Sequence, residues 1–102
     1  MTQKENETSL KKNIKVLFKV YHVHCYSNPQ GLGAIRGRPD IEAIWKGITY
    51  YIECKHPKDG GKMSSYQKNQ QAKIEAAGAP YIKARSLEDV VKGMGLPTGR
   101  LF

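Results

Sequence analysis

Cysteine is scarce in this chain, and long apolar segments are absent from it. Two cysteines among 102 residues are too few for the disulfide scaffold on which many small secreted domains depend. No apolar run approaches the roughly 20 residues that a membrane-spanning helix needs. Residues 1–15 are polar and charged, unlike a secretory signal. We therefore expect a protein of the reducing cytoplasm that has no membrane partner.

The length excludes a second domain and a deep substrate cavity. A chain of 102 residues buries roughly 60–70% of the surface that its unfolded form exposes, which is enough for one modest core. No internal repeat divides the sequence. We expect a single domain over residues 1–102 that acts through a surface groove, with residues 1–6 and 94–102 flexible or involved in assembly.

Acidic residues are also scarce, and the charge is unevenly distributed. The chain has 17 Lys and Arg against 9 Asp and Glu, a formal net charge of +8. Residues 8–39 contain no acid and six basic residues: Lys11, Lys12, Lys15, Lys19, Arg36 and Arg38. Such charge is typical of nucleic-acid binding, because each neutralised phosphate releases counterions. A basic surface kept only for solubility is the simpler alternative.

The glycine-rich residues 28–39 lack the lysine of a phosphate-binding loop. Gly31 and Gly33 are followed by no Gly-Lys-Ser/Thr and open no helix, so turn chemistry accounts for them better than a nucleotide cradle does. We expect no nucleotide cofactor.

Apolar spacing predicts a helix that begins at Glu7. The apolar side chains recur at helical intervals, at Leu10, Ile14, Leu17, Phe18 and Tyr21. On another side of this helix Lys11, Lys15 and Lys19 form a stripe at four-residue spacing. This stripe either follows a phosphate backbone or faces water.

The rest of the chain alternates strands and helices. Strands are expected at 41–45 and 48–55, paired antiparallel through a turn at Lys46-Gly47. A helix from Ser64 to about residue 77, a strand at 80–84 and a short helix at 86–92 follow. This order predicts an α/β fold with a mixed central sheet flanked by helices.

Two acids and a lysine converge in this arrangement. The hairpin brings Asp40, at the start of one strand, beside Glu53 and Lys55 at the end of the next. Mg²⁺ and Mn²⁺ prefer oxygen ligands, which Asp40, Glu53 and the carbonyl of Cys54 supply. Lys55 would then hold or deprotonate a water and offset charge on a phosphate. Alone, Glu-x-Lys is common in exposed strands, and Asp after Pro is ordinary turn chemistry.

A longer pattern contains these residues. Gly37-Arg38-Pro39-Asp40, then Tyr51-Ile52-Glu53-Cys54-Lys55, then Ser64-Ser65-Tyr66-Gln67 and Gly78 resemble the VRR-NUC family of the PD-(D/E)xK nuclease superfamily, in the small standalone form found in phages and bacteria. The resemblance extends over about residues 7–87. It departs at Arg38, where small or apolar residues are common in the family.

The resemblance implies a restriction-endonuclease-like core and a metal-dependent, structure-selective DNA endonuclease that acts on branched DNA such as four-way junctions. Asp40 and Glu53 would be ligands, Lys55 catalytic, and Gln67 a support from the following helix. A capping box of Ser64 and Gln67 would also explain the glutamine. Because the family tends to carry an acid at the start of its first helix, Glu7 becomes a further ligand candidate. A first-turn acid also suits the helix dipole, and Glu5 is the substitute if the helical register differs.

Other readings of single residues are weaker. His22, His24, Cys25, Cys54 and His56 contain no spacing typical of a zinc finger or ribbon, and Cys54 is expected to face the core. Trp45, Tyr50 and Tyr51 are more typical of packing than of base stacking.

Five basic residues are the candidate DNA contacts: Lys11, Lys15, Lys19, Arg36 and Arg38. A non-catalytic basic module, or an accessory subunit of a replication or repair assembly, is the alternative function. Acids in a basic groove weaken phosphate binding unless a cation lies between them, which favours the enzyme. We also expect a two-fold homodimer, with Leu96, Leu101 and Phe102 as candidate interface residues.

Overall fold

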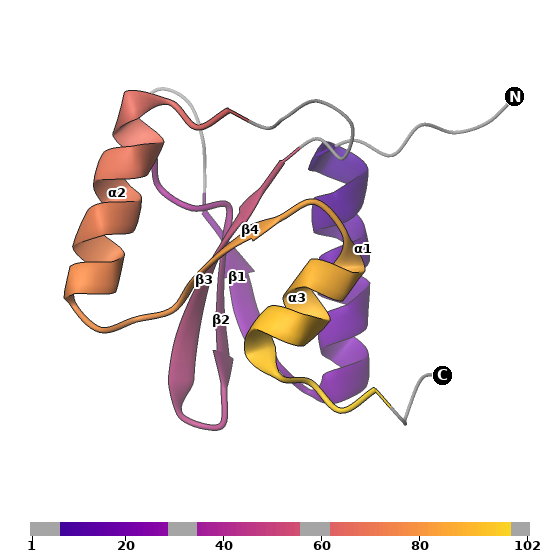
Figure 1. Ribbon diagram of the computed structural model, residues 1–102. Coiled ribbons are helices and arrows are strands. Elements are labelled where there is room, and N and C mark those ends of the chain that lie inside the picture. Colours follow the sequence, from indigo (N-terminus) through magenta and orange to yellow (C-terminus); the bar gives the residue numbers. More distant parts are fainter. Residues whose placement is uncertain (1–6, 29–34, 56–61, 99–102) are drawn as a thin grey trace, which may run out of the picture.

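The described part of the chain forms the expected α/β fold, with three helices and four strands, one strand more than the sequence predicted (Figure 1). The computed structural model describes residues 7–28, 35–55 and 62–98, and for Glu7 the backbone only. The elements are α1 (Glu7–Tyr21), β1 (His24–Ser27), β2 (Ile41–Trp45), β3 (Ile48–Cys54), α2 (Ser65–Ala76), β4 (Tyr81–Ala84) and α3 (Leu87–Met94). None of the helices in these ranges is long and apolar enough to cross a membrane.

The sheet has the order β1-β2-β3-β4 and is mixed. Strands β1, β2 and β3 pair antiparallel in succession, whereas β4 lies parallel to β3 after the crossover through α2. The predicted hairpin is confirmed, with Lys46 and Gly47 both at positive φ in its turn. Its register places Ile41 opposite Ile52. Asp40 and Glu53, one residue beyond this pair on each strand, therefore lie at the same end of the hairpin.

One face of the sheet carries the apolar core. Helices α1 and α3 cover this face, and α2 lies on the other side (Figure 1). All five apolar positions predicted for α1 are buried, with Phe18 at 1% exposure. Side chains of the sheet and of α3 meet them: Ile41, Ala43, Tyr50, Ile52, Cys54, Ile82, Ala84, Val90, Val91 and Met94. Tyr50 and Cys54 are thus packing residues, as expected.

Helix α2 differs from the other two, because none of its residues is buried. Its start is fixed by the predicted capping box: Ser64 Oγ accepts from Gln67 N–H, and Gln67 accepts from the Ser64 backbone N–H. The helix begins where the sequence indicated because these two orphan backbone donors find partners there.

The end of the chain corrects one expectation. The prediction that residues from 94 onward are flexible or available for assembly is wrong for Met94 and Leu96, which are 3% and 4% exposed. Gly95 ends α3 in the left-handed conformation, at φ 71°, and Leu96 N–H donates to Val91 O at 3.0 Å. The chain thereby folds back, and the Tyr21 hydroxyl donates to Pro97 O. Leu96 is therefore excluded as a dimer contact, and Leu101 and Phe102 lie outside the described residues.

Candidate active site

Asp40 is held in place where the chain enters β2. Its side chain is almost fully buried, and Oδ2 accepts from the Cys54 backbone N–H at 2.8 Å. Asn28, itself buried, fixes the preceding backbone: its N–H donates to Asp40 O at 2.8 Å, and its Nδ2 donates to Pro39 O at 2.7 Å. The carboxylate is thus tied to the end of β3, and the backbone at Asp40 is tied to Asn28, the residue that follows β1.

Glu53 and Lys55 bring opposite charges together at this end of β3. Both are buried, at 3% and 6% exposure. Lys55 Nζ lies 3.8 Å from Glu53 Oε2 and donates to the Lys62 backbone carbonyl at 3.3 Å. Burying a charge costs free energy unless the group is paired and hydrogen-bonded. The fold therefore supplies partners for both charges, unlike an exposed ion pair at the surface.

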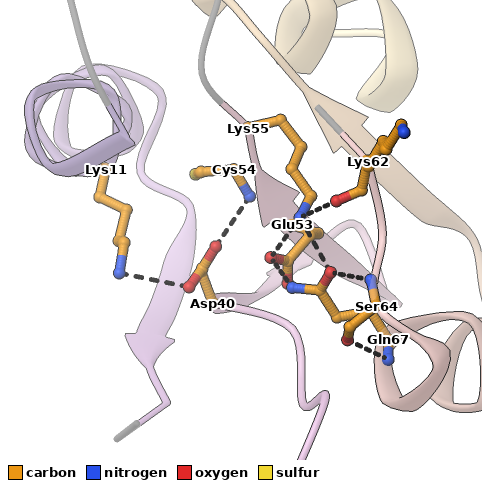
Figure 2. A network of polar contacts seen from close by, with 8 residues as sticks. All are labelled: Lys11, Asp40, Glu53, Cys54, Lys55, Lys62, Ser64 and Gln67. Carbon is orange, nitrogen blue, oxygen red and sulfur yellow. Dashed lines mark hydrogen bonds and ion pairs between the residues drawn. The ribbon is translucent and has the colours of Figure 1, made fainter. Parts of the chain in front are cut away.

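Gln67 connects the two charges (Figure 2). Its Nε2 donates to Glu53 Oε2 at 2.8 Å, and its Oε1 accepts from Lys55 Nζ at 2.8 Å. The same Oε1 accepts from Ser64 N–H at 2.9 Å. Gln67 therefore makes both sets of contacts: it caps α2, and it bonds to the two charged residues of the site.

The loop before Asp40 packs directly on α2. Gly37 has φ 78°, and a Cβ built on it would lie 2.3 Å from the backbone C and O of Tyr66, a distance that admits only glycine. Arg36 donates to the Tyr66 hydroxyl at 2.8 Å, and its guanidinium lies 5.1 Å from the centroid of that ring. The Asp40 and Gln67 segments are therefore in contact through their backbones.

The predicted DNA-contact residues lie in different environments. Lys11 Nζ forms an ion pair with Asp40 Oδ1 at 3.2 Å, so it belongs to the site (Figure 2). Lys15 and Lys19 are exposed on α1. Arg38 pairs with Glu42 at 3.0 Å, and Arg36 holds Tyr66 as described above. The three lysines do lie along α1, but Lys11 pairs with Asp40, whereas Lys15 and Lys19 face solvent.

Tyr81 is a site neighbour that sequence reasoning missed. Burial raises the pKa of its hydroxyl, and the carboxylates of Glu53, Asp40 and Glu75 raise it further, so the hydroxyl stays protonated. In the described parts of the chain this buried Oη has no hydrogen-bond partner. The signal in the sequence was the parallel strand 80–84, whose pairing with β3 places Tyr81 opposite Tyr51.

The donor set suits a hard divalent cation. Two buried carboxylates, Asp40 and Glu53, come from adjacent strand ends, and oxygen is the ligand atom that Mg²⁺ and Mn²⁺ prefer. Glu5, together with the Glu7 side chain, lies outside the described residues. Where side chains are described, no group of three or more His, Cys, Asp or Glu gathers. Both Cys25 and Cys54 are free thiols, and His56 also lies outside the described residues.

Comparisons with known proteins define the fold. No family model matches the chain, and no curated protein matches it. A solved structure described as "VRR_NUC domain" matches with a TM-score of 0.70 and 22% sequence identity, covering 88% of this chain and 95% of that one. The chain therefore has the fold of a VRR-NUC domain, within the restriction-endonuclease-like α/β class. The resemblance inferred from the motifs is confirmed at the level of the fold.

Proposed function

We propose that the protein is a metal-dependent endonuclease that hydrolyses phosphodiester bonds in DNA. The observation that carries this proposal is the Gln67 side chain, which joins the buried Glu53 carboxylate to the buried Lys55 ammonium at 2.8 Å each. Asp40 lies on the adjacent strand end. An acid pair with a neighbouring lysine, in a chain of net charge +8, suits the hydrolysis of a phosphodiester.

Asp40 and Glu53, with the backbone carbonyl of Cys54, would hold Mg²⁺ or Mn²⁺. A bound divalent cation supplies charge stabilisation on the phosphate and a more acidic water. Lys55 would hold a water and offset the negative charge that develops on the phosphate. Gln67 fixes the orientation of both Glu53 and Lys55, the role that a hydrogen-bonded neighbour of a metal ligand commonly has. Glu7 stays a candidate fourth ligand.

Branched DNA, including four-way junctions, is the substrate class that we propose. The chain is small, so two copies around a two-fold axis would present two sites to symmetry-related strands. The homodimer stays a prediction, without Leu96 in its interface. The two free thiols, Cys25 and Cys54, favour the reducing cytoplasm.

A non-catalytic DNA-binding module is the competing function. It would use the exposed lysines of α1 but has no use for two buried carboxylates, whose negative charge opposes phosphate binding. The same objection applies to an accessory subunit that binds DNA without cutting it. The geometry at Glu53, Lys55 and Gln67 therefore favours the enzyme.

A cleavage assay tests the proposal. Supercoiled plasmid, linear duplex and a four-way junction are incubated with the wild type in Mg²⁺, Mn²⁺ or EDTA, and with Lys55→Met and Asp40→Asn. We expect cleavage only with metal, and a rate roughly 10²–10⁴-fold lower in Lys55→Met. Lys92→Met is the matched control, since Lys92 is exposed on α3 and its replacement should not change the rate. DNA binding without cleavage in either metal would contradict the enzyme and favour the non-catalytic module.

A further inference from the structure

Lys11 differs from the other lysines of α1 by its partner. Its Nζ lies 3.2 Å from Asp40 Oδ1, while the other carboxylate oxygen accepts from the Cys54 N–H at 2.8 Å. The Asp40 side chain is 8% exposed and that of Lys11 31%. Lys15, one turn further along α1, is exposed. Lys11 thus reaches from the surface onto a buried carboxylate (Figure 2).

Among the side chains that the structure describes, the two carboxylates of the site are balanced when Lys11 is included. Asp40 and Glu53 are opposed by Lys11 and Lys55, one ammonium for each carboxylate. Lys55 is fixed by Gln67 and by the Lys62 carbonyl, so it stays with Glu53. Lys11 has only the Asp40 carboxylate as its acid partner among the ion pairs of the described residues.

A divalent cation on Asp40 would meet the Lys11 ammonium at close range. Like charges a few ångströms apart repel strongly where water is largely excluded, so Lys11 and the cation compete for the same carboxylate. A lysine side chain is long and flexible, and the Lys11 side chain is partly open to solvent. It can therefore leave Asp40, whereas Asp40 is fixed by Cys54 and the backbone.

We propose, on the basis of the metal-dependent function above, that Lys11 is an exchangeable counter-cation of Asp40. When no divalent cation is bound, Lys11 neutralises the Asp40 carboxylate. When a cation binds to Asp40, the Lys11 side chain leaves the carboxylate, and its ammonium contacts a phosphate of the DNA. Lys11 thus acts on the metal site through Asp40 and on the DNA by direct contact with a phosphate. Binding of metal and of DNA are consequently coupled, and each raises the affinity for the other.

Direct titration of Mn²⁺ tests the first half of this proposal. Free Mn²⁺ is followed by electron paramagnetic resonance in the wild type, Lys11→Met, Lys11→Gln, Lys11→Arg and Asp40→Asn. We expect Lys11→Met and Lys11→Gln to bind Mn²⁺ roughly fivefold to tenfold more tightly, because a competing charge is removed. Lys11→Arg keeps the charge and should stay near wild type. Lys15→Met is the matched control, and circular dichroism verifies that each variant folds.

The salt dependence of DNA binding tests the second half. Anisotropy with a labelled duplex is measured in the Lys55→Met background, so that no strand is cut, with and without Mn²⁺. Adding Lys11→Met should reduce the slope of log K against log[salt] by roughly one unit with Mn²⁺ and leave it unchanged in EDTA. Equal reductions in both conditions would make Lys11 a permanent phosphate contact and overturn the exchange.

The outcomes separate this inference from the proposed function. Suppose that the wild type binds Mn²⁺, that Asp40→Asn does not, and that Lys11→Met binds no more tightly than the wild type. The proposed exchange of Lys11 for the metal is then wrong, and the metal site is not. If neither the wild type nor Lys11→Met binds Mn²⁺, the metal site itself is wrong and the inference is wrong with it.

Discussion

The two faces of the sheet are built from different kinds of side chain. Beneath α1 and α3 the buried residues are apolar, with Phe18, Ile14 and Ile52 at 1% exposure or less. Beneath α2 the buried groups are Glu53 and Lys55, and the helix itself buries no residue. One face therefore stabilises the fold by removing apolar surface from water, and the other holds charges that cost free energy to bury. The difference indicates that the stabilising core and the candidate site lie on opposite faces of one sheet.

The largest effect on stability is expected at the centre of the apolar face. Phe18→Ala should reduce the free energy of unfolding by about 3–5 kcal/mol, because it removes a ring at 1% exposure and leaves a cavity. Val16→Ala on the same helix is the matched control: Val16 is 59% exposed, and the change should stay within about 0.5 kcal/mol. Urea denaturation measures both. Similar losses in the two variants would contradict the asymmetry between the faces.

A smaller effect, on activity more than on stability, is expected on the α2 face. Gln67→Ala removes the link between Glu53 and Lys55. Under the proposed function it should lower cleavage roughly 10–100-fold, the usual effect of replacing a hydrogen-bonded neighbour of a metal ligand. Its cost in stability should be about 1 kcal/mol, the usual size of a lost cap. Cleavage rate and urea denaturation are measured on the same samples.

Ser64→Ala is the control that separates the two roles of Gln67. It removes the hydroxyl that accepts from Gln67 N–H but leaves the contacts of Gln67 with Glu53 and Lys55. We expect a similar loss of stability with cleavage near wild type. If Ser64→Ala loses as much activity as Gln67→Ala, helix capping alone explains the glutamine.

The smallest effect is expected on the exposed side of α1. Lys15→Gln with Lys19→Gln should leave stability nearly unchanged and reduce the slope of log K against log[salt] for DNA by roughly one unit per lost phosphate contact. Fluorescence anisotropy over a range of salt concentrations measures the slope. An unchanged slope would mean that these two lysines serve only solvation.

Local patterns predicted most of the fold. The apolar spacing of α1, the Lys46-Gly47 turn and the Ser64 cap each act within a few residues, so the sequence alone reveals them. Strand β1 was not predicted, because His24–Ser27 is an edge strand with no buried residue and so lacks apolar alternation. Residues 94–98 resemble a breaker-rich tail, yet Met94 is buried as the last residue of α3, and the turn at Gly95 brings Leu96 into the core. Where a residue's role depends on distant packing, its local pattern is uninformative.

In the candidate site, too, the sequence predicted what local patterns determine and missed what depends on distant packing. Hairpin register places Asp40 and Glu53 at the same strand end, and the start of α2 brings Gln67 onto Glu53 and Lys55. These positions follow from local patterns, whereas the catalytic and metal-binding roles stay predictions. The pairing of Lys11 with Asp40 was not predicted, since a stripe on a helix does not specify where that helix crosses the sheet. Tyr81 was missed for a similar reason: its place beside the carboxylates depends on the parallel pairing of β4 with β3.

The close approach of Gly37 to Tyr66 has a consequence for how precisely the site is aligned. Helix α2 has no buried side chain to anchor it, so apolar burial cannot define its position to a fraction of an ångström. The backbone contact at Gly37 does so by shape: any larger residue would push the first turn of α2 outward. Gln67, the residue after Tyr66, would move with it. The alignment of Gln67 with Glu53 and Lys55 therefore depends on the absence of a side chain at Gly37.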